Sequence, residues 1–483
     1  MNYRMVLRSL GTLLVLESFA MIPSLSVSLI YNEPEARHFL LSMLIILAVG
    51  LPFLIIKPKT KDFNSADGFA VVGIGWLFIS IFGAMPFYFS GAIPSFINAF
   101  FESISGFTTT GASILTQIES LPKGILFWRS FTHWLGGMGV LVLALAILPS
   151  VGSRSIYILK AESPGPAPGK LVPKIKQTAK ILYSIYLFIT AFEVILLIIS
   201  GMPLYDSLIH SFGTAGTGGF SSMNDSVGAY GKVRYEIIIT VFMLMFGASF
   251  TVYFQLLKGK VKNWYKNEEL IFYLSVVSFS IILITFNLLG SIYGTILEAL
   301  RYSSFQVASI ISTTGYVTAD FNKWPLLSKI ILVMLMFVGG CAGSTGGAIK
   351  NIRFLILFKA FRKELMKILH PRGFYTVRIG GKVIEEETLT GVFVFFFMYM
   401  FVLAAGIFIV SLDNFDIETT VMSVIASIGN IGPGLGLVGA SGNYEGFSVI
   451  SKLVLSFCML VGRLEIYPIL LLVMPSFWKK IKI

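Results

Sequence analysis

Charged residues are scarce in this sequence. Asp, Glu, Lys and Arg make up 13% of its 483 residues, whereas hydrophobic residues make up 55%. A soluble domain of this length needs far more charge to cover its surface. The apolar residues instead gather in runs of 18 or more, the length that crosses about 30 Å of hydrocarbon as a helix. We therefore predict an integral membrane protein.

Cysteine and histidine are also rare, with two and four residues respectively. Cys341 and Cys458 lie in separate apolar segments, and neither has a partner at ligand spacing, so we expect two packing residues and no metal site or disulfide. A P-loop, a nucleophile elbow, a zincin motif and paired catalytic carboxylates are missing at convincing spacing. We expect no enzyme activity and no organic cofactor.

The first apolar run, Leu7–Ile30, follows Arg4 and Arg8. A signal peptide begins with the same charge pattern, but this run is long for one and Ser24-Leu25-Ser26 is a weak cleavage site, so a retained span is favoured. With the N-terminus in the cytoplasm, 27 of the 37 Lys and Arg residues fall on the cytoplasmic side, as the positive-inside rule requires. The net charge of +12 therefore reflects membrane topology and contact with anionic lipid, and not nucleic-acid binding.

After two spans, Leu7–Ile30 and His38–Ile56, the chain repeats one pattern four times. Each unit has a long apolar run, a short amphipathic run, a loop rich in Gly, Thr and Ser, and a second long run. The short runs cannot cross a bilayer and fit re-entrant half-helices. The long first runs are 68–90, 179–200, 269–290 and 388–411; the short runs are 95–107, 204–214, 295–311 and 415–427; the second long runs are 125–149, 235–257, 326–349 and 448–475.

This internal repetition predicts an all-α membrane fold with four pseudo-symmetric helix–pore-loop–helix repeats around one pore, plus two extra N-terminal helices. The predicted boundaries are 1–62 for the N-terminal pair, then 63–175, 176–265, 266–380 and 381–483 for the repeats.

Each loop after a short run carries a glycine, and these glycines are spaced by 108, 96 and 117 residues. Non-helical backbone at membrane depth leaves carbonyl oxygens unpaired unless they line a cavity. In potassium filters such oxygens replace the hydration shell of the ion, and glycine permits the backbone geometry. The C-terminal ends of the half-helices would also favour a cation. Helix packing by small residues is the alternative for any single loop, but not for four. The predicted filter residues are Thr109, Thr110, Gly111, Thr217, Gly218, Gly219, Thr313, Thr314, Gly315, Asn430, Ile431 and Gly432.

The sequence resembles the Trk/Ktr/HKT superfamily of potassium transporters over essentially its whole length. The motifs that carry the resemblance are Ser-Gly-Phe-Thr-Thr-Thr-Gly-Ala (105–112), Ser-Thr-Thr-Gly-Tyr (312–316), Gly-Cys-Ala-Gly-Ser-Thr-Gly-Gly (340–347) and Gly-Asn-Ile-Gly-Pro-Gly-Leu-Gly (429–436). The extra N-terminal spans make the chain more similar to the bacterial Trk membrane (pore) subunit than to the shorter Ktr subunit.

The resemblance implies a homodimer in the cell (inner) membrane with one pore per protomer, and a cytosolic nucleotide-binding regulatory subunit. Within this superfamily, serine at the first filter position is associated with sodium preference, so Gly111 indicates potassium. The second loop departs from the Thr-Thr-Gly pattern, and Gly216 competes with Gly219 for the equivalent position.

A glycine-rich stretch interrupts the second span of the third repeat, and so many glycines disfavour a helix. Close helix packing is one explanation, and the resemblance implies an intramembrane gate loop. Arg463, in the apolar run Leu453–Met474, needs water or a partner at that depth. The resemblance implies that Arg463 projects into the pore, the alternative being an ion pair with Glu465 or another buried acid. The predicted gate residues are Gly339, Gly340, Gly343, Ser344, Thr345, Gly346, Gly347 and Arg463.

We expect Lys350 and Arg353, which follow this stretch, to lie at the cytoplasmic surface and contact lipid headgroups or transmit regulation. Two alternatives to a potassium pore remain open. One is an ion-coupled, alternating-access transporter, which also uses broken helices at the midplane, and the other is a sodium-conducting pore.

Overall fold

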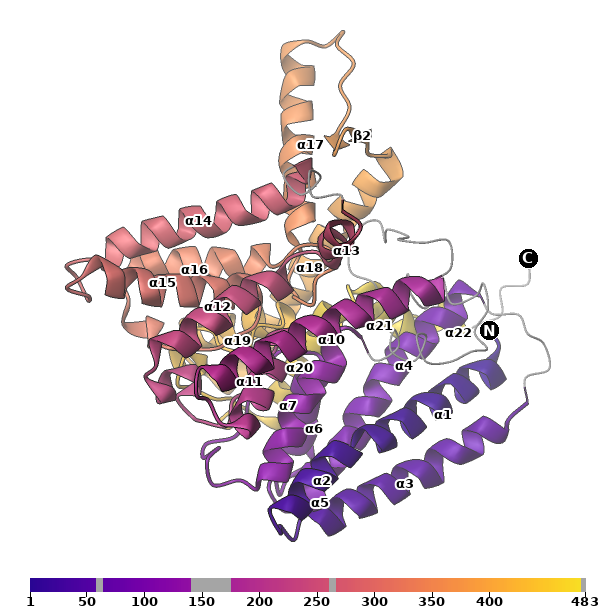
Figure 1. Cartoon of the computed structure of the whole chain (residues 1–483). Coiled ribbons are helices and arrows are strands. Elements are labelled where there is room, and N and C mark those ends of the chain that lie inside the picture. Colours follow the sequence, from indigo (N-terminus) through magenta and orange to yellow (C-terminus); the bar gives the residue numbers. More distant parts are fainter. Residues whose placement is uncertain (58–63, 140–174, 260–265, 479–483) are drawn as a thin grey trace.

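The computed structural model describes residues 1–57, 64–139, 175–259 and 266–478 (Figure 1). Within these ranges the fold is helical apart from two short antiparallel strands, β1 (Arg378–Ile379) and β2 (Lys382–Val383), and one isolated bridge. Six helices in the described part are long and apolar enough to span a membrane, or seven if one bent pair counts as a span. The predicted all-α, multi-pass membrane fold is confirmed.

The two predicted N-terminal spans cross closely; the first consists of α1 and α2, and the second is α3. Gly11 and Gly50 make this possible, because a Cβ atom on Gly11 would lie 2.7 Å from the Gly50 carbonyl oxygen. Small residues at a crossing let helix backbones approach, which is the usual basis of helix packing in membranes. The helices of this pair are α1 (Tyr3–Ala20), α2 (Ile22–Ile30) and α3 (Ala36–Ile55).

The rest of the chain follows one order four times: a long helix, a half-helix, a loop and a second helix. The long helices are α4 (Ser65–Gly83), α10 (Ile175–Ile199), α14 (Glu268–Leu288) and α18 (Glu386–Val410). The half-helices are α6 (Phe96–Phe107), α11 (Leu204–Gly216), α15 (Ile296–Ile311) and α19 (Ile417–Ile428). The second helices are α7 (Lys123–Gly137), α12 (Val233–Gly247), α16 (Leu326–Val338) and α20 (Val449–Arg463).

Local sequence signals set several of these helix starts. Pro122, Pro203 and Pro325 immediately precede α7, α11 and α16, and proline at a helix start sacrifices no intrahelical hydrogen bond. The half-helices α15 and α19 begin at side-chain caps. Thr295 accepts a hydrogen bond from the Glu298 amide and Asp416 accepts one from the Thr419 amide, which satisfies an otherwise unpaired N–H group.

The second helices are shorter than the sequence predicted. They end after 13 to 15 residues, whereas the apolar pattern predicted continuous spans in repeats one, two and four and an interruption in repeat three. In repeat two, α12 bends by 92° into α13 (Phe250–Leu257). In repeat four, α20 stops before α21 (Tyr467–Val473). Residues 140–149 of the first run lie outside the described residues.

These breaks are associated with a tertiary hydrogen bond and with non-helical φ angles, neither of which can be predicted from hydropathy. The Gly247 carbonyl oxygen at the end of α12 accepts a 2.8 Å hydrogen bond from the Cys341 amide of the third repeat. Between α20 and α21, Glu465 and Ile466 have φ angles of 54° and 72°, which an α-helix does not contain.

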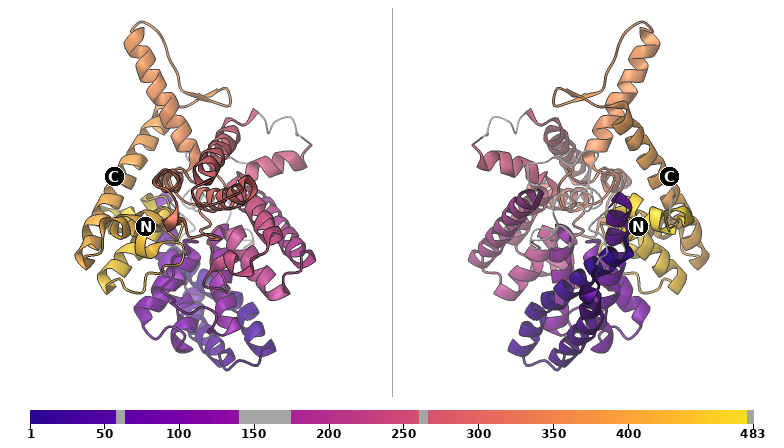
Figure 2. Two further views of the ribbon diagram at one scale, coloured as in Figure 1. Left: turned by 90° about the vertical axis from the view of Figure 1, so that its left-hand side faces the viewer. Right: turned by 90° about the vertical axis from the view of Figure 1, so that its right-hand side faces the viewer.

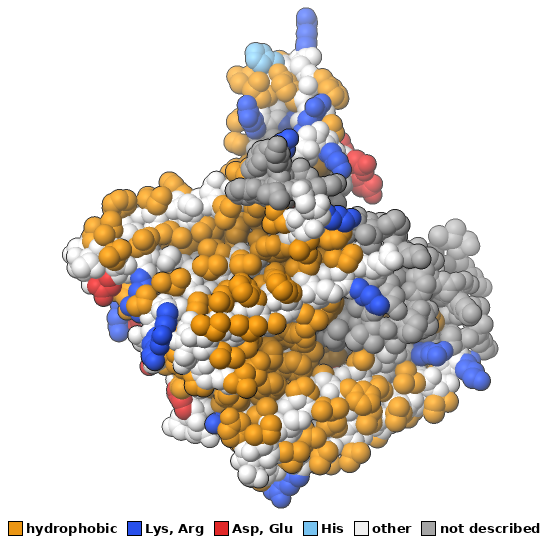
Figure 3. Space-filling view, viewed as in Figure 1, with side chains coloured by type: hydrophobic (Ala, Val, Ile, Leu, Met, Phe, Trp, Pro, Cys, Tyr) orange, Lys and Arg blue, Asp and Glu red, His pale blue; other side chains and the backbone are white. Residues whose placement is uncertain are grey.

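A helical hairpin projects from the body of the molecule on the side opposite α1 and α3 (Figures 1 and 2). It consists of α17 (Asn351–Leu369), the two strands and the start of α18. On the face drawn in Figure 3, hydrophobic side chains form a broad belt, and charged side chains gather at its margins and on the hairpin. Large exposed apolar side chains such as Phe188, Phe279 and Phe286 contribute to the apolar surface, as expected for helices that face lipid.

The remaining short elements connect these helices. They are α5 (Met85–Phe89), α22 (Pro475–Trp478) and the 3₁₀ segments Ser226–Tyr230, Phe321–Lys323, Ser411–Asp413 and Gly436–Val438.

Candidate ion-conducting site

The four predicted filter loops share one backbone conformation. In each loop a residue with φ between 52° and 60° is followed two positions later by a glycine with φ between 76° and 90°. Side chains disfavour this left-handed region, so a glycine at the second position is a conformational requirement. The first positions are Thr109, Thr217, Thr313 and Asn430, and the glycines are Gly111, Gly219, Gly315 and Gly432.

The loops also share their hydrogen bonding to the half-helices. The residue before each glycine donates its amide to the carbonyl oxygen five residues earlier, over 2.8 to 3.0 Å. In the second loop this donor is Gly218, which bonds Gly213. Gly219 is therefore the equivalent of the other three glycines. Gly216 is the last residue of α11, and a Cβ atom there would lie 2.2 Å from the His133 carbonyl oxygen.

The four glycines form a closed ring of contacts. A Cβ atom on Gly111 would lie 2.0 Å from the carbonyl oxygen of Gly218. The same distance is 2.1 Å from Gly219 to Thr314 and from Gly315 to Ile431, and 2.6 Å from Gly432 back to Thr110. Each loop thus abuts the next and the fourth abuts the first, so the loops surround one axis. The oxygens in contact with the glycines belong to Thr110, Gly218, Thr314 and Ile431.

A cavity opens beside this ring. All four glycines line it, and its empty volume, including open solvent, is about 530 Å³. Arg129, Ser221 and Tyr444 are among its other lining residues. The half-helices end at the ring, so the partial negative charge of their C-terminal carbonyl groups lies close to it. This arrangement favours a cation.

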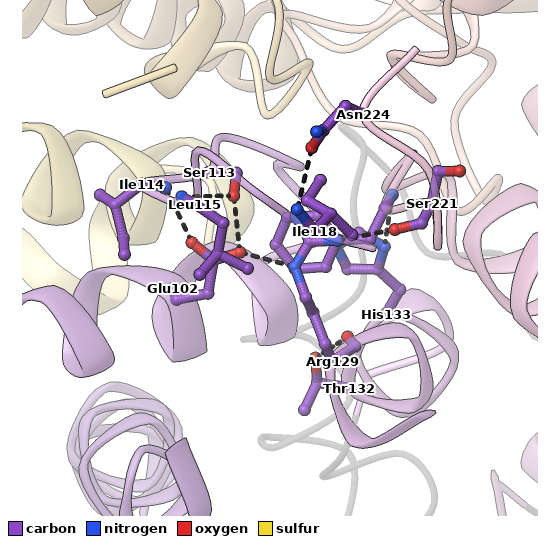
Figure 4. A network of polar contacts seen from close by, with 11 residues as sticks. Glu102, Ser113, Ile114, Leu115, Ile118, Arg129, Thr132, His133, Ser221 and Asn224 are labelled. Atoms are coloured by element: carbon purple, nitrogen blue, oxygen red, sulfur yellow. Dashed lines mark hydrogen bonds and ion pairs between the residues drawn. The ribbon is translucent and has the colours of Figure 1, made fainter. Parts of the chain in front are cut away.

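A buried ion pair joins the first two loops (Figure 4). Arg129 Nε on α7 donates to Glu102 Oε1 on α6 over 2.6 Å, and both side chains are buried. The Glu102 carboxylate also accepts hydrogen bonds from Ser113 Oγ and the Ile114 amide, both at 2.9 Å, in the first loop. Arg129 Nη1 donates to the Ser221 carbonyl oxygen in the second loop over 3.0 Å.

Other hydrogen bonds connect the remaining neighbours around the ring. The Tyr316 hydroxyl donates to the Phe220 carbonyl oxygen at 3.3 Å, joining loops two and three. Asn322 exchanges two hydrogen bonds of 3.2 Å with the backbone of Gly436, joining the third and fourth repeats. The Tyr444 amide donates to the Ser113 carbonyl oxygen at 2.8 Å, joining the fourth repeat to the first. Each neighbouring pair of loops is therefore linked.

The predicted gate residues 339–347 form a loop against the ends of two half-helices. The Gly347 amide donates to Thr313 Oγ1 over 2.7 Å, and the Ala348 amide donates to the Gly429 carbonyl oxygen over 3.0 Å. A Cβ atom on Gly346 would lie 2.9 Å from the Ser312 carbonyl oxygen. The stretch leaves helical geometry, with φ angles of 66° at Gly339 and 72° at Gly343. It is a loop packed against the base of the ring and not a tightly packed helix.

Arg463 connects this loop to the first repeat. Its Nη1 donates to the Thr345 carbonyl oxygen at 2.7 Å, and its Nη2 donates to the carbonyl oxygens of Gly136 and Gly137 at 2.5 and 2.7 Å. Glu465 forms its ion pair with Arg353 at 2.5 Å. The alternative of a local pair between Arg463 and Glu465 does not describe the contacts seen here.

The expectation that Lys350 and Arg353 contact lipid headgroups is wrong. They are 2% and 5% exposed. Lys350 Nζ donates to the Gly346 carbonyl oxygen within the loop, and Arg353 pairs with Glu465 and lies 3.8 Å from the centroid of the Phe395 ring. Burial of both side chains within the protein removes them from headgroup contact.

Both cysteines are buried, as their apolar neighbourhoods predicted. The described residues contain no group of three or more His, Cys, Asp or Glu side chains arranged to hold a metal ion.

Sequence reasoning missed the Glu102–Arg129 pair. The available signal was an acid in an amphipathic half-helix and an Arg inside the apolar run 125–149, since an ionisable residue at membrane depth needs a partner. The two residues lie 27 positions apart, on helices joined by a loop, so no local spacing rule identified them as a pair.

Comparisons with known proteins match cation transport proteins over nearly the whole chain. A family model described as TrkH, cation transport protein, matches residues 35–480. The Trk system potassium uptake protein TrkH of Salmonella typhimurium is 37% identical over 485 residues, which cover 99% of this chain and 100% of the relative. The Trk system potassium uptake protein TrkG of Escherichia coli is 32% identical, covering 99% of each chain.

A solved structure matches the fold. The crystal structure of the potassium transporter TrkH from Vibrio parahaemolyticus superposes with a TM-score of 0.89 at 34% identity, covering 99% of this chain and 100% of that one. A matching family model, relatives above 30% identity and a shared fold, all over nearly full length, lead to one conclusion. The chain belongs to the TrkH family of cation transport proteins.

Proposed function

We propose that this chain is the membrane subunit of a potassium uptake system, and that potassium passes through the ring formed by the four glycine loops. The chain is a transporter and not an enzyme, since its family transports cations. Its relatives are Trk system potassium uptake proteins. The observation that carries the proposal is the closed order of contacts from Gly111 through Gly219, Gly315 and Gly432 back to the first loop.

This arrangement suits an ion that must lose its water. Four backbone carbonyl oxygens at equivalent positions around one axis can replace hydration oxygens on all sides at once. The carbonyl oxygens of Thr110, Gly218, Thr314 and Ile431 adjoin the glycines, and they are the first candidates for ion contact. Potassium is then the transported ion, and the chain needs no organic cofactor.

The loop of residues 339–347 and Arg463 form the proposed gate. Support comes from position, because the loop bonds Thr313 and Gly429 at the base of the ring. Arg463 adds a positive charge there and joins the loop to α7 through Gly136 and Gly137. A unit charge near the ion path raises the barrier to a cation by Coulomb repulsion. Opening then requires the loop to leave the axis and Arg463 to release its carbonyl partners.

The family resemblance supports further parts of the proposal. They are a homodimer with one pore per protomer, a cytosolic nucleotide-binding regulatory subunit, and insertion in the cell inner membrane. Helix α17 carries basic residues including Lys359, Lys363 and Lys367, which favours the location of the hairpin on the cytoplasmic side together with the N-terminus. The repeat boundaries 63–175, 176–265, 266–380 and 381–483 divide the chain into four units of equal architecture.

Flux through purified protein in liposomes tests the function. Vesicles loaded with potassium chloride and diluted into a low-potassium buffer are assayed for uptake of tracer potassium, rubidium, sodium and lithium. We expect downhill flux of potassium and rubidium to exceed that of sodium and lithium, with no added proton or sodium gradient. Dependence on such a gradient would favour alternating access, and equal flux of all four ions would favour an unselective pore.

A further inference from the structure

We propose that Glu102 and Arg129 are specificity-determining positioning residues that fix the spacing between the first two loops of the ring. This inference rests on the proposed potassium pore and adds a pair of side chains, outside the loops, that decides which cation fits.

A recurring feature of the half-helices first points to Glu102. The position nine residues before each ring glycine is occupied by a fully buried polar side chain in all four repeats. In the first three repeats that side chain reaches the segment just after its glycine, whereas in the fourth Ser423 bonds its own helix at Thr420. We call these three side chains braces, because each links its half-helix to the segment after the glycine. Glu102 accepts hydrogen bonds from Ser113 and Ile114. His210 Nε2 lies 3.1 Å from Ser221 Oγ, and Gln306 Nε2 lies 3.5 Å from Thr318 Oγ1.

Glu102 differs from the other braces because it is charged and because its counterion spans two loops. Arg129 lies eight residues before the end of α7, and the positions at the same distance from the ends of the other second helices are Ile239, Ile330 and Leu455. The structure describes these positions in all four repeats, and an ion pair like Glu102–Arg129 occurs at them only in the first repeat. The pseudo-symmetry is broken at the contact between loops one and two.

The contacts of Arg129 make this brace rigid. Its Nε bonds Glu102 at 2.6 Å, its Nη1 bonds the Ser221 carbonyl oxygen at 3.0 Å, and its guanidinium lies 3.5 Å from the centroid of the Phe220 ring. Phe220 and Ser221 directly follow Gly219. A planar guanidinium with donors in fixed directions can make these contacts together, whereas a lysine ammonium behaves as a point charge. The pair thus sets the position of the second loop relative to the first.

The position of these loops bears directly on ion choice. Discrimination of potassium from the smaller sodium ion requires that the carbonyl ring resist contraction or repacking around the smaller ion, whichever account of filter selectivity applies. Ligand groups hold their geometry only when the groups behind them are fixed. Loosening the brace between loops one and two therefore allows the ring to adapt to sodium.

Charge balance gives the pair a second effect. Arg129 borders the cavity beside the ring, where an unpaired positive charge would repel incoming cations. Glu102 neutralises it at 2.6 Å. Substituting Glu102 alone therefore lowers cation flux as well as selectivity. Arg129→Lys keeps the charge balance and removes only the planar guanidinium that donates to both loops.

The experiment compares potassium-over-sodium flux ratios in liposomes for the wild-type chain, Glu102→Gln, Arg129→Lys and the double variant Glu102→Gln/Arg129→Met. The double variant removes both charges and so leaves no unpaired ion at this site, and it decides the question if a single variant does not accumulate as folded protein. We expect the ratio to fall about tenfold in Arg129→Lys and in the double variant, with measurable potassium flux.

A partly buried ion pair, in which the Glu236 side chain is 3% and the Arg301 side chain 25% exposed, provides the control. Arg301 on α15 and Glu236 on α12 form a two-pronged pair at 2.5 and 2.6 Å without contact to a ring loop. Arg301→Lys and Glu236→Gln/Arg301→Met should weaken the fold and leave the flux ratio unchanged.

Different results would refute the proposed potassium pore and the positioning role of Glu102 and Arg129. If the wild-type chain does not favour potassium, the proposed function falls. If the wild-type chain favours potassium and the Glu102 and Arg129 variants keep the same ratio, only the positioning role is refuted. An equal fall in the Arg301 control would likewise refute it, since general loosening of the fold would then account for the change.

Discussion

Arg463 Nη1 donates a 2.7 Å hydrogen bond to the carbonyl oxygen of Thr345. This contact joins the end of α20 in the fourth repeat to the loop of residues 339–347 in the third. The same side chain bonds the end of α7. One arginine therefore connects three of the four repeats, and we propose that this arrangement closes the pore.

Arg463→Ala should raise potassium flux. Two unit charges about 4 Å apart repel by roughly 1–4 kcal/mol, depending on the effective dielectric constant. Removing the Arg463 charge should therefore lower the barrier to a cation, and the substitution also releases the loop at Thr345. The measurement is tracer potassium uptake per mole of folded protein in liposomes. Arg463→Lys is the matched variant and should give intermediate flux, because it keeps the charge and loses the fork. Unchanged or lower flux in folded Arg463→Ala protein contradicts the gate assignment.

Gly111→Ser should reduce the preference for potassium over sodium. The new Cβ atom would lie 2.0 Å from the Gly218 carbonyl oxygen at a residue with φ of 81°, so both loops must shift. Competition of sodium with rubidium uptake measures the effect. Gly446→Ser is the control, because a Cβ atom there meets no atom within 4 Å. A functional Gly111→Ser protein with wild-type selectivity would show that this loop is not part of the filter.

Thr313→Ala should increase the time that the gate loop spends open. Thr313 Oγ1 accepts the Gly347 amide at 2.7 Å, and loss of such a bond costs about 1 kcal/mol net. Single-channel or flux measurements should show activity a few times higher than in wild type. Thr313→Ser keeps the hydroxyl and should behave like wild type. Equal activity of the Ala and Ser variants would mean that this bond does not hold the loop.

Glu465→Ala should destabilise the protein more than loss of a surface pair. Arg353, whose side chain is 6% exposed, would lose its partner at 2.5 Å, and an unpaired buried charge costs roughly 3–5 kcal/mol. Thermal unfolding of the detergent-solubilised protein measures this loss. Glu364→Gln breaks an exposed pair with Lys367 and should cost about 0–1 kcal/mol. Similar losses in the two variants would contradict the structural role of the Arg353–Glu465 pair.

The repeated architecture was predictable because it repeats in sequence. Membrane spans follow from apolar runs, and the ring glycines follow from loops of similar composition after short amphipathic runs. The geometry then resolved Gly219 from Gly216, because only the former has the positive φ angle and the place in the ring. That choice depends on contact with Thr314, almost a hundred residues away in the chain, which no local pattern contains.

The polar contacts between repeats were not predictable for the same reason. Lys350 and Arg353 follow an interrupted span and carry charge, which on local grounds favours the membrane surface. The burial of Arg353 depends on Glu465, more than a hundred residues later. The bend between α12 and α13 likewise follows from contacts with the third repeat. The hydropathy of residues 235–257 therefore does not predict it.

Anomalous diffraction from crystals grown in rubidium chloride tests the central claim most directly. Rubidium substitutes for potassium in carbonyl sites and scatters anomalously, so its position can be measured without assuming a pore. We expect rubidium density on the axis between Gly111, Gly219, Gly315 and Gly432, in contact with backbone oxygens from all four loops. Ordered rubidium elsewhere in the protein, with none inside the ring, would contradict it.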